Sequence, residues 1–190
     1  VHGDAVNWSE VRILPLSKRN TQVNKVLWKS PEVENLTMEQ PQEQFEAIAL
    51  IGMTMQVTAF YGRQQFANLH ERIVNHVMSD QYGLLYESGV CVGFALWGTL
   101  SPAHGNIFKA GLRPISAVEL TAGTQLWFMD VAAPFGHEKA VIQALFQLHC
   151  EEHEFAWSLK PRNGQSDVRI HKLRDPTKHV DMVKQLQEKE

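Results

Sequence analysis

The chain has 190 residues, of which 44% are hydrophobic and 21% are charged, and this is enough for one ordinary globular domain with a full core. The net charge of −3 and the scattered basic residues argue against a nucleic-acid-binding protein. No apolar run approaches the roughly 18 residues that a membrane-spanning helix needs, and the sequence predicts no N-terminal leader. Two isolated cysteines, Cys91 and Cys150, favour a reducing compartment, so we expect a cytoplasmic protein.

Residues 1–40 are weakly patterned and mix polar residues with isolated large apolar side chains. A disordered tail carries fewer such side chains, so we expect this segment to lie on a protein surface, either over its own domain or across a dimer. The expected anchors are Trp8, Leu14, Leu27 and Trp28. The chain is therefore divided into an N-terminal extension, residues 1–40, and a domain, residues 41–190.

Apolar residues at three- and four-residue steps predict a first helix from Phe45 and a second helix after an interruption at Tyr61-Gly62. The first stripe consists of Phe45, Ile48, Gly52, Met55 and Ala59, and the second of Phe66, Leu69, Ile73 and Val77. Because His76 shares the second stripe, we expect a core or interface histidine.

The stretch "YGLLYESGVCVGFALWGTL" (82–100) predicts two strands around a turn at Glu87-Ser88-Gly89. Residues 101–123 are rich in Gly, Pro and Ala and predict a loop with one short helix. "TQLWFMDVAAPF" (124–135) predicts the next strand, which ends at Pro134.

"HEKAVIQALFQLHCEEH" (137–153) predicts a helix with Val141, Ala144, Leu145 and Leu148 on one stripe. "EFAWSL" and "DVRIHKL" then predict a hairpin across the turn "KPRNGQ", and residues 176–190 predict a terminal helix. This order of elements predicts an α/β (α+β) single domain with a mostly antiparallel central sheet.

Asp130 stands alone in the apolar run "LWFMDVAAPFG" (126–136). A buried carboxylate is costly unless it is paired, hydrogen-bonded or used in chemistry, so Asp130 is either a structural acid at a strand end or a functional one. His149 and His153 have the i, i+4 spacing that can hold a metal ion. Without a third ligand in view, a solvated helix face is the better interpretation of these two histidines.

Three stretches together resemble one family, the toxin-activating lysine acyltransferases that mature RTX haemolysins. "DQYGLL" (80–85), which leads into "CVGFALWGTL" (91–100), and "FAWSLKPRNGQSDVRIHKL" (155–173) resemble family segments weakly. The more specific match is the Asp-x-x-Ala-Pro-Phe string that begins at Asp130. The resemblance runs from about Phe45 to about residue 175.

The resemblance implies a single domain with a fold similar to the GNAT acyltransferases, usually dimeric. It implies transfer of a fatty acyl chain from acyl carrier protein, the donor substrate, to internal lysines of an RTX-type protoxin, with no bound cofactor. The family uses an aspartate in its Ala-Pro-Phe string, which corresponds to Asp130, and a histidine near the second helix. Counting back without gaps from Gln81-Tyr82 places that histidine at Tyr61 and a nearby serine at Thr58.

Because this sequence departs from the family at that position, the identity of the second catalytic group stays open. The Tyr61 phenol has an ordinary pKa of about 10 and is a poor base near neutrality, although it can donate a hydrogen bond to an oxyanion. His70 lies nine residues further on, roughly 13 Å along a continuous helix, and is the next candidate. Trp97 is either a core residue or a wall of an acyl chamber.

We favour direct attack by a substrate lysine on the acyl donor, with Asp130 accepting or directing the proton, because neither cysteine has an activating setting. Two alternatives remain. One is a weakened relative that binds a toxin or carrier protein like a chaperone. The other is a small-molecule N-acyltransferase that uses acyl-coenzyme A, against which stands the lack of a glycine string for a pyrophosphate.

Overall fold

The computed structural model describes residues 25–31, 33–40, 43–58, 66–162 and 165–173. These residues form a seven-stranded sheet in which the strands lie side by side in chain order. Every neighbouring pair is antiparallel except β5 and β6, which are parallel. The strands are β1 (Lys25–Lys29), β2 (Leu36–Gln40), β3 (Tyr82–Glu87), β4 (Val90–Leu100), β5 (Gln125–Ala132), β6 (Phe155–Arg162) and β7 (Gln165–Lys172). The mixed α/β class and the mostly antiparallel sheet predicted from the sequence are confirmed, as a GNAT-like single domain requires.

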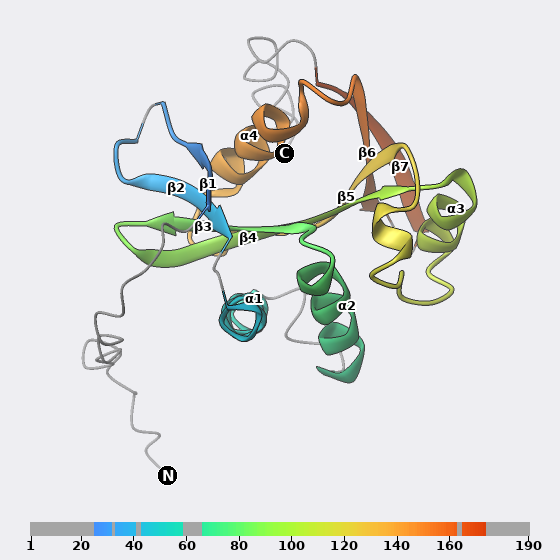
Figure 1. Ribbon diagram of the computed structural model, residues 1–190, viewed down its shortest axis with the longest axis horizontal. Helices are drawn as coiled ribbons and strands as arrows, with labels where there is room; N and C mark the ends of the chain where they lie inside the picture. The colour runs from blue at the N-terminus through green and yellow to red at the C-terminus, as the bar shows by residue number, and fades with distance from the viewer. Residues whose placement is uncertain (1–24, 32, 41–42, 59–65, 163–164, 174–190) are drawn as a thin grey trace.

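Helices cover both faces of the sheet, as Figure 1 shows. Helices α1 (Gln44–Gln56) and α2 (Phe66–Met78) pack on one face, and α4 (Glu138–His149) packs on the other. Helix α3 (Pro102–Ala110) and a 3₁₀ turn (Glu119–Thr121) follow β4 and cover Trp127. The α4 that crosses from β5 to β6 explains the parallel pair, because parallel neighbours need a long connection.

Each covered face has its own core. Under α1 and α2 the sheet contributes Tyr82, Leu84, Phe94 and Leu96, all at most 1% exposed. Under α4 the buried residues from the sheet include Trp97, Leu126 and Phe128. The strands thus present alternate residues to two apolar layers, which accounts for the continuous hydrophobic run of β4.

The hairpin expected at Glu87-Ser88-Gly89 is confirmed. Ser88 and Gly89 have φ values of 51° and 83°, the left-handed conformations that a tight two-residue turn between twisted strands requires. The helix expected over residues 137–153 is confirmed as α4, and Val141, Ala144 and Leu145 of its predicted stripe are buried. Two-residue and 3.6-residue periodicities were therefore reliable where an element buries one clear face.

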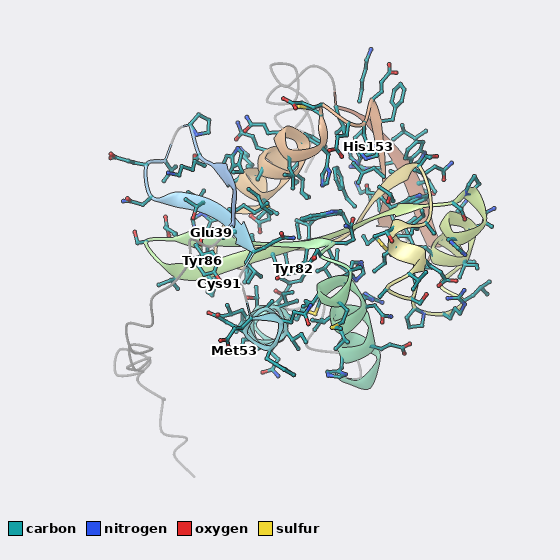
Figure 2. All side chains as sticks on the ribbon, viewed as in Figure 1. Glu39, Met53, Tyr82, Tyr86, Cys91 and His153 are labelled. Carbon is teal, nitrogen blue, oxygen red and sulfur yellow. The ribbon has the colours of Figure 1, made fainter. Side chains whose placement is uncertain are left out.

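The apolar stripe predicted for α1 is only partly on its buried face. Met55 is buried and Ile48 packs against the core, but Phe45, which opened the predicted stripe, is 86% exposed. The buried residues of α1 are Ala47, Ile51, Thr54 and Met55. Met53 points away from the sheet on the outer side of α1 (Figure 2). Apolar residues surround this helix on several sides, so its periodicity did not single out the face toward the sheet.

Two strand ends also differ from the prediction. β5 ends at Ala132, two residues before Pro134, because Ala133 begins the turn that leads to Gly136, whose φ is 89°. β6 continues through Lys160 to Arg162, so the predicted turn "KPRNGQ" is mostly strand.

β1 and β2 lie in the N-terminal extension and were not predicted. β2 pairs with β3, and β1 pairs with β2, so residues 25–40 extend the sheet of the domain. Trp28 is buried under α4, where its indole N–H donates a hydrogen bond to the Gln147 side chain. Leu27 also packs against this core. The other expected anchors, Trp8 and Leu14, and the helix predicted at residues 176–190 lie outside the described residues.

Candidate active site

Asp130 lies at an irregularity in the pairing of β4 with β5. Leu96 is opposite Asp130 and Trp97 is opposite Phe128, so Met129 has no partner of its own and forms a β-bulge. Side chains normally alternate between the faces of a strand. Because of the bulge, the side chains of the two successive residues Met129 and Asp130 both contact α2.

The partner of Asp130 on α2 is Arg72. The guanidinium Nη1 lies 3.1 Å from Oδ2 and 3.4 Å from Oδ1 of the carboxylate. Asp130 is 9% exposed and Arg72 is 33% exposed. A carboxylate this deeply buried requires a compensating charge, and Arg72 supplies it from the solvent-accessible side.

His76 lies one helical turn after Arg72 and completes this layer. Its Nδ1 lies 2.8 Å from the carbonyl oxygen of Arg72, to which it donates, and its Nε2 lies 3.4 Å from Sδ of Met129. Burial lowers the pKa of His76 to about 4, so the ring is neutral near pH 7. Among the described side chains, Arg72 rather than a histidine therefore supplies the positive charge beside Asp130.

The sheet opens beside this site. β5 and β6 pair only from Leu126–Ala156 to Phe128–Ser158, whereas β5 runs on to Ala132 and β6 to Arg162. Asp130 lies two residues beyond the last pair. The edge of β5 toward β6 is thus without a strand partner in this part of the described structure, and such an edge offers N–H and C=O groups to an extended ligand.

The other predicted site residues are only partly placed. Tyr61 lies outside the described residues, so its role in place of the family histidine stays a prediction. Thr58 follows α1, and its hydroxyl donates to the carbonyl oxygen of Thr54 at 2.9 Å. His70 is exposed on α2, and it points about 200° around the helix from Arg72, since each residue adds about 100°.

Trp97 lies on the opposite face of the sheet from Asp130. Its ring is 4% exposed and meets the ring of His149 edge-on, with centroids 5.1 Å apart. The structure therefore shows a core residue under α4, and the proposed role as a wall of an acyl chamber stays a prediction.

His149 is the clearest correction among the histidines. It was expected on a solvated helix face, but it is 9% exposed and packs against Trp97, and burial lowers its pKa to about 4. Figure 2 shows His153 beyond the end of α4, on the side of β6 and β7. No group of three or more His, Cys, Asp or Glu side chains that could hold a metal occurs among the described residues.

Both cysteines are free thiols, and burial raises the pKa of Cys91. A raised pKa keeps Cys91 protonated near neutrality, so it is unsuited to act as a nucleophile.

Arg72 is the residue that the sequence interpretation missed. It stands four residues before His76 and therefore shares the helix face that looks onto the sheet. A cation on the apolar face of a helix, together with an aspartate inside an apolar strand, is the signal from which the pair was predictable.

The fold agrees with the comparison to known families. The model of the RTX toxin acyltransferase family matches residues 40–174, which include everything from α1 to β7. The chain belongs to this family.

Individual relatives are distant. The leukotoxin-activating lysine-acyltransferase LktC of serotype A11 from Mannheimia haemolytica is 25% identical over 85 residues, which is 45% of this chain and 48% of the relative. The lysine-acyltransferase RtxC of Vibrio cholerae is 27% identical over 113 residues, 58% of this chain and 71% of the relative. The RTX-I toxin-activating lysine-acyltransferase ApxIC of Actinobacillus pleuropneumoniae is 24% identical over 97 residues, 51% of this chain and 56% of the relative. The chain thus spans about half the length of the leukotoxin-activating relative. Among the described residues, no helix is long and apolar enough to cross a membrane.

Proposed function

We propose that this chain is a protein-lysine acyltransferase that moves a fatty acyl group from acyl carrier protein to internal lysines of an RTX-type protoxin. The family match and the names of the relatives support the reaction class. The observation that carries the proposal is Asp130, a buried carboxylate of the Asp-x-x-Ala-Pro-Phe string, held by Arg72 where β5 and β6 part.

Asp130 supplies the proton acceptor that this reaction needs. A lysine amine has an ordinary pKa of about 10.4 and must lose a proton before its nitrogen can attack a thioester carbonyl carbon. In the proposed step the proton moves to the carboxylate, directly or through a second group. The C–N bond forms, the C–S bond breaks, and the departing thiolate takes up a proton.

Arg72 orients Asp130 in this mechanism. Its Nη1 contacts both carboxylate oxygens and fixes the carboxylate beside the incoming amine. His76 anchors the carbonyl of Arg72 and excludes water from this side of the pair.

The unpaired edge of β5 supports a donor with an extended, amide-containing arm. Such an arm adds to the sheet through main-chain hydrogen bonds and places its thioester near Asp130. A carrier protein bears its acyl group on an arm of this kind, and so does coenzyme A. The carrier is preferred because the sequence has no glycine string for a pyrophosphate.

We further propose a homodimer in the cytoplasm. The free thiols of Cys91 and Cys150 suit a reducing compartment. The outer side of α1 exposes Phe45, Met53 and Val57, which is an apolar surface of the kind that a subunit contact covers.

The test is lysine acylation of the protoxin, followed by mass spectrometry, with loaded acyl carrier protein or acyl-coenzyme A at equal concentration. We expect Asp130→Asn to lower the transfer rate at least about 100-fold, because it removes the proton acceptor but keeps the shape. Asp80→Asn is the matched control, since Asp80 is an exposed acid in a left-handed turn that Asn adopts equally well.

Full activity of Asp130→Asn, with unchanged melting, would remove the basis of the proposal. A clear preference for the coenzyme A donor would indicate a small-molecule type of acyltransferase. Binding of the protoxin without any transfer by the unmodified chain would indicate a weakened relative that serves as a binding partner.

A further inference from the structure

We propose that Ser158 and His171 form a second reactive site, separate from Asp130, which hydrolyses esters of fatty acids. The Oγ of Ser158 lies 2.8 Å from Nε2 of His171. This is the distance of a hydrogen bond between a nucleophile and its general base.

The β6–β7 hairpin fixes this pair. Ser158 is opposite Arg169 and Ala156 is opposite His171, so Ser158 and His171 are diagonal neighbours on the same face of the sheet. That face is the α4 side, because Ser158 pairs with Phe128, which lies in the core under α4. The Asp130 carboxylate contacts α2 on the other face.

The pair also lies where the sheet opens. Phe128–Ser158 is the last pair between β5 and β6, so Ser158 marks the end of their shared ladder. Both Ser158 and His171 are half-buried, so neither residue is shut inside the core. A substrate that enters between the strands therefore meets Ser158 on one face and Asp130 on the other.

Aromatic rings pack against His171 and make this side of the pair apolar. The His171 ring lies 6.2 Å from the ring of Phe128 and 5.7 Å from that of Phe146, centroid to centroid. Packing between two rings restricts the rotation of the imidazole, which preserves its alignment with the serine hydroxyl.

A further polar atom, on His149, lies close to the ring of Phe128. The Nε2 of His149 is buried and has no hydrogen-bond partner among the described residues, and the His149 ring lies 6.1 Å from that of Phe128. A buried ring nitrogen without a hydrogen-bond partner is unfavourable, so its retention points to a polar group that a ligand supplies. The carboxyl or carbonyl end of an acyl ligand provides such a group.

The charge of the hairpin favours an ester whose carbonyl becomes negative in the reaction. Arg169 is directly opposite Ser158 on the same face of the hairpin, so a positively charged residue neighbours the nucleophile. The pair thus has a nucleophile, a base, a neighbouring cation and apolar rings beside it, the combination that ester hydrolysis requires.

The reaction balances with water as the only co-reactant. Oγ of Ser158 attacks the carbonyl carbon while Nε2 of His171 takes the hydroxyl proton, in the tautomer whose proton is on Nδ1. The ester C–O bond breaks, and the alcohol leaves with that proton. Water then attacks the acyl-serine and gives a proton to Nε2, which returns it to Ser158 as the fatty acid leaves.

The experiment measures hydrolysis of p-nitrophenyl octanoate by the full chain, with labelling by a fluorophosphonate located by peptide mass spectrometry. We expect the unmodified chain to hydrolyse the ester and to carry the label on Ser158. Ser158→Ala and His171→Gln should each lower the rate at least about tenfold. Ser79→Ala is the matched control, because the Ser79 hydroxyl is bonded to helix carbonyls rather than to a histidine.

Asp130→Asn distinguishes this site from the proposed acyl transfer, because it should leave ester hydrolysis unchanged. The inference is overturned if the unmodified chain hydrolyses the ester no faster than Ser158→Ala, or if the label is absent from Ser158. It is also overturned if His171→Gln is labelled as fast as the unmodified chain while its melting temperature is unchanged.

Discussion

Buried polar groups lie on both faces of the sheet near β5, but they are compensated differently on the two faces. On the α2 face, Asp130 is buried but has a full counter-charge in Arg72, and Arg72 reaches solvent. On the α4 face, Trp97 and His149 pack ring against ring, and the buried Nε2 of His149 has no partner among the described residues.

This difference separates the Asp130 site from the packed core around Trp97. The α2 face combines the buried Asp130 carboxylate, the β-bulge at Met129 and the partly exposed Arg72. This arrangement suits a reactive site and is not required for core packing. The α4 face holds large rings in close contact, so it should carry more of the free energy of unfolding. The predictions below test this division.

The largest effect on stability is expected at Trp97. Trp97→Ala should lower the free energy of unfolding by about 3–5 kcal/mol, because it leaves a cavity under α4 beside His149. Urea denaturation followed by circular dichroism measures this loss. Exposed Met53→Ala on α1 is the control and should change little. A loss of stability in Trp97→Ala no larger than that in Met53→Ala would show that the core around Trp97 does not carry most of the free energy of unfolding.

Acid should weaken both faces through their buried histidines. The pKa values of His76 and His149 are about 4 in the folded chain because of burial, against 6.5 for a free histidine. Between these values the unfolded chain binds the protons and the folded chain does not. Their contribution to stability is therefore present above pH 6.5 and is lost as the pH falls toward 4, by about 1–2 kcal/mol per histidine at pH 5.

His149→Phe isolates the α4 face in the same titration. It removes one titrating ring and its unpartnered nitrogen but keeps the aromatic packing on Trp97. The variant should lose roughly half of the pH dependence between pH 7 and pH 5. An unchanged pH dependence would show that His149 binds its proton equally well in the folded and the unfolded chain.

The last stability prediction concerns Arg72. Arg72→Met should lower the free energy of unfolding by about 1–3 kcal/mol, because it leaves the buried Asp130 carboxylate without the charge that compensates it. The same variant should lower acyl transfer about tenfold, since the Asp130 carboxylate loses its orientation. Equal transfer rates for Arg72→Met and the unmodified chain would make the ion pair a structural feature only.

The sequence predicted the elements that bury one clear face. β3, β4 and α4 followed from simple periodicity, and the burial of Asp130 followed from its isolation in an apolar run. The sequence predicted the buried face of α1 only in part, because exposed apolar residues such as Phe45 obscure the helical period. It missed β1 and β2, whose short strands gain their stability from pairing with β3 and from burial of Trp28.

The site itself was only half predictable, because its geometry depends on pairings between distant segments. The bulge at Met129 comes from the register between β4 and β5, and the ion pair joins residues 58 positions apart. The Ser158–His171 contact depends on the diagonal register of the β6–β7 hairpin. No local pattern specifies these registers.

The most direct test of the central claim, that Arg72 and Asp130 act as one unit in acyl transfer, is a double-mutant cycle. Transfer rates are measured for the unmodified chain, Arg72→Met, Asp130→Asn and the variant that carries both substitutions. If the pair acts as a unit, the double variant should be no slower than Asp130→Asn alone, because Arg72 has no carboxylate left to orient. Effects that multiply, so that the double variant is slower by the product of the two single losses, would contradict the account.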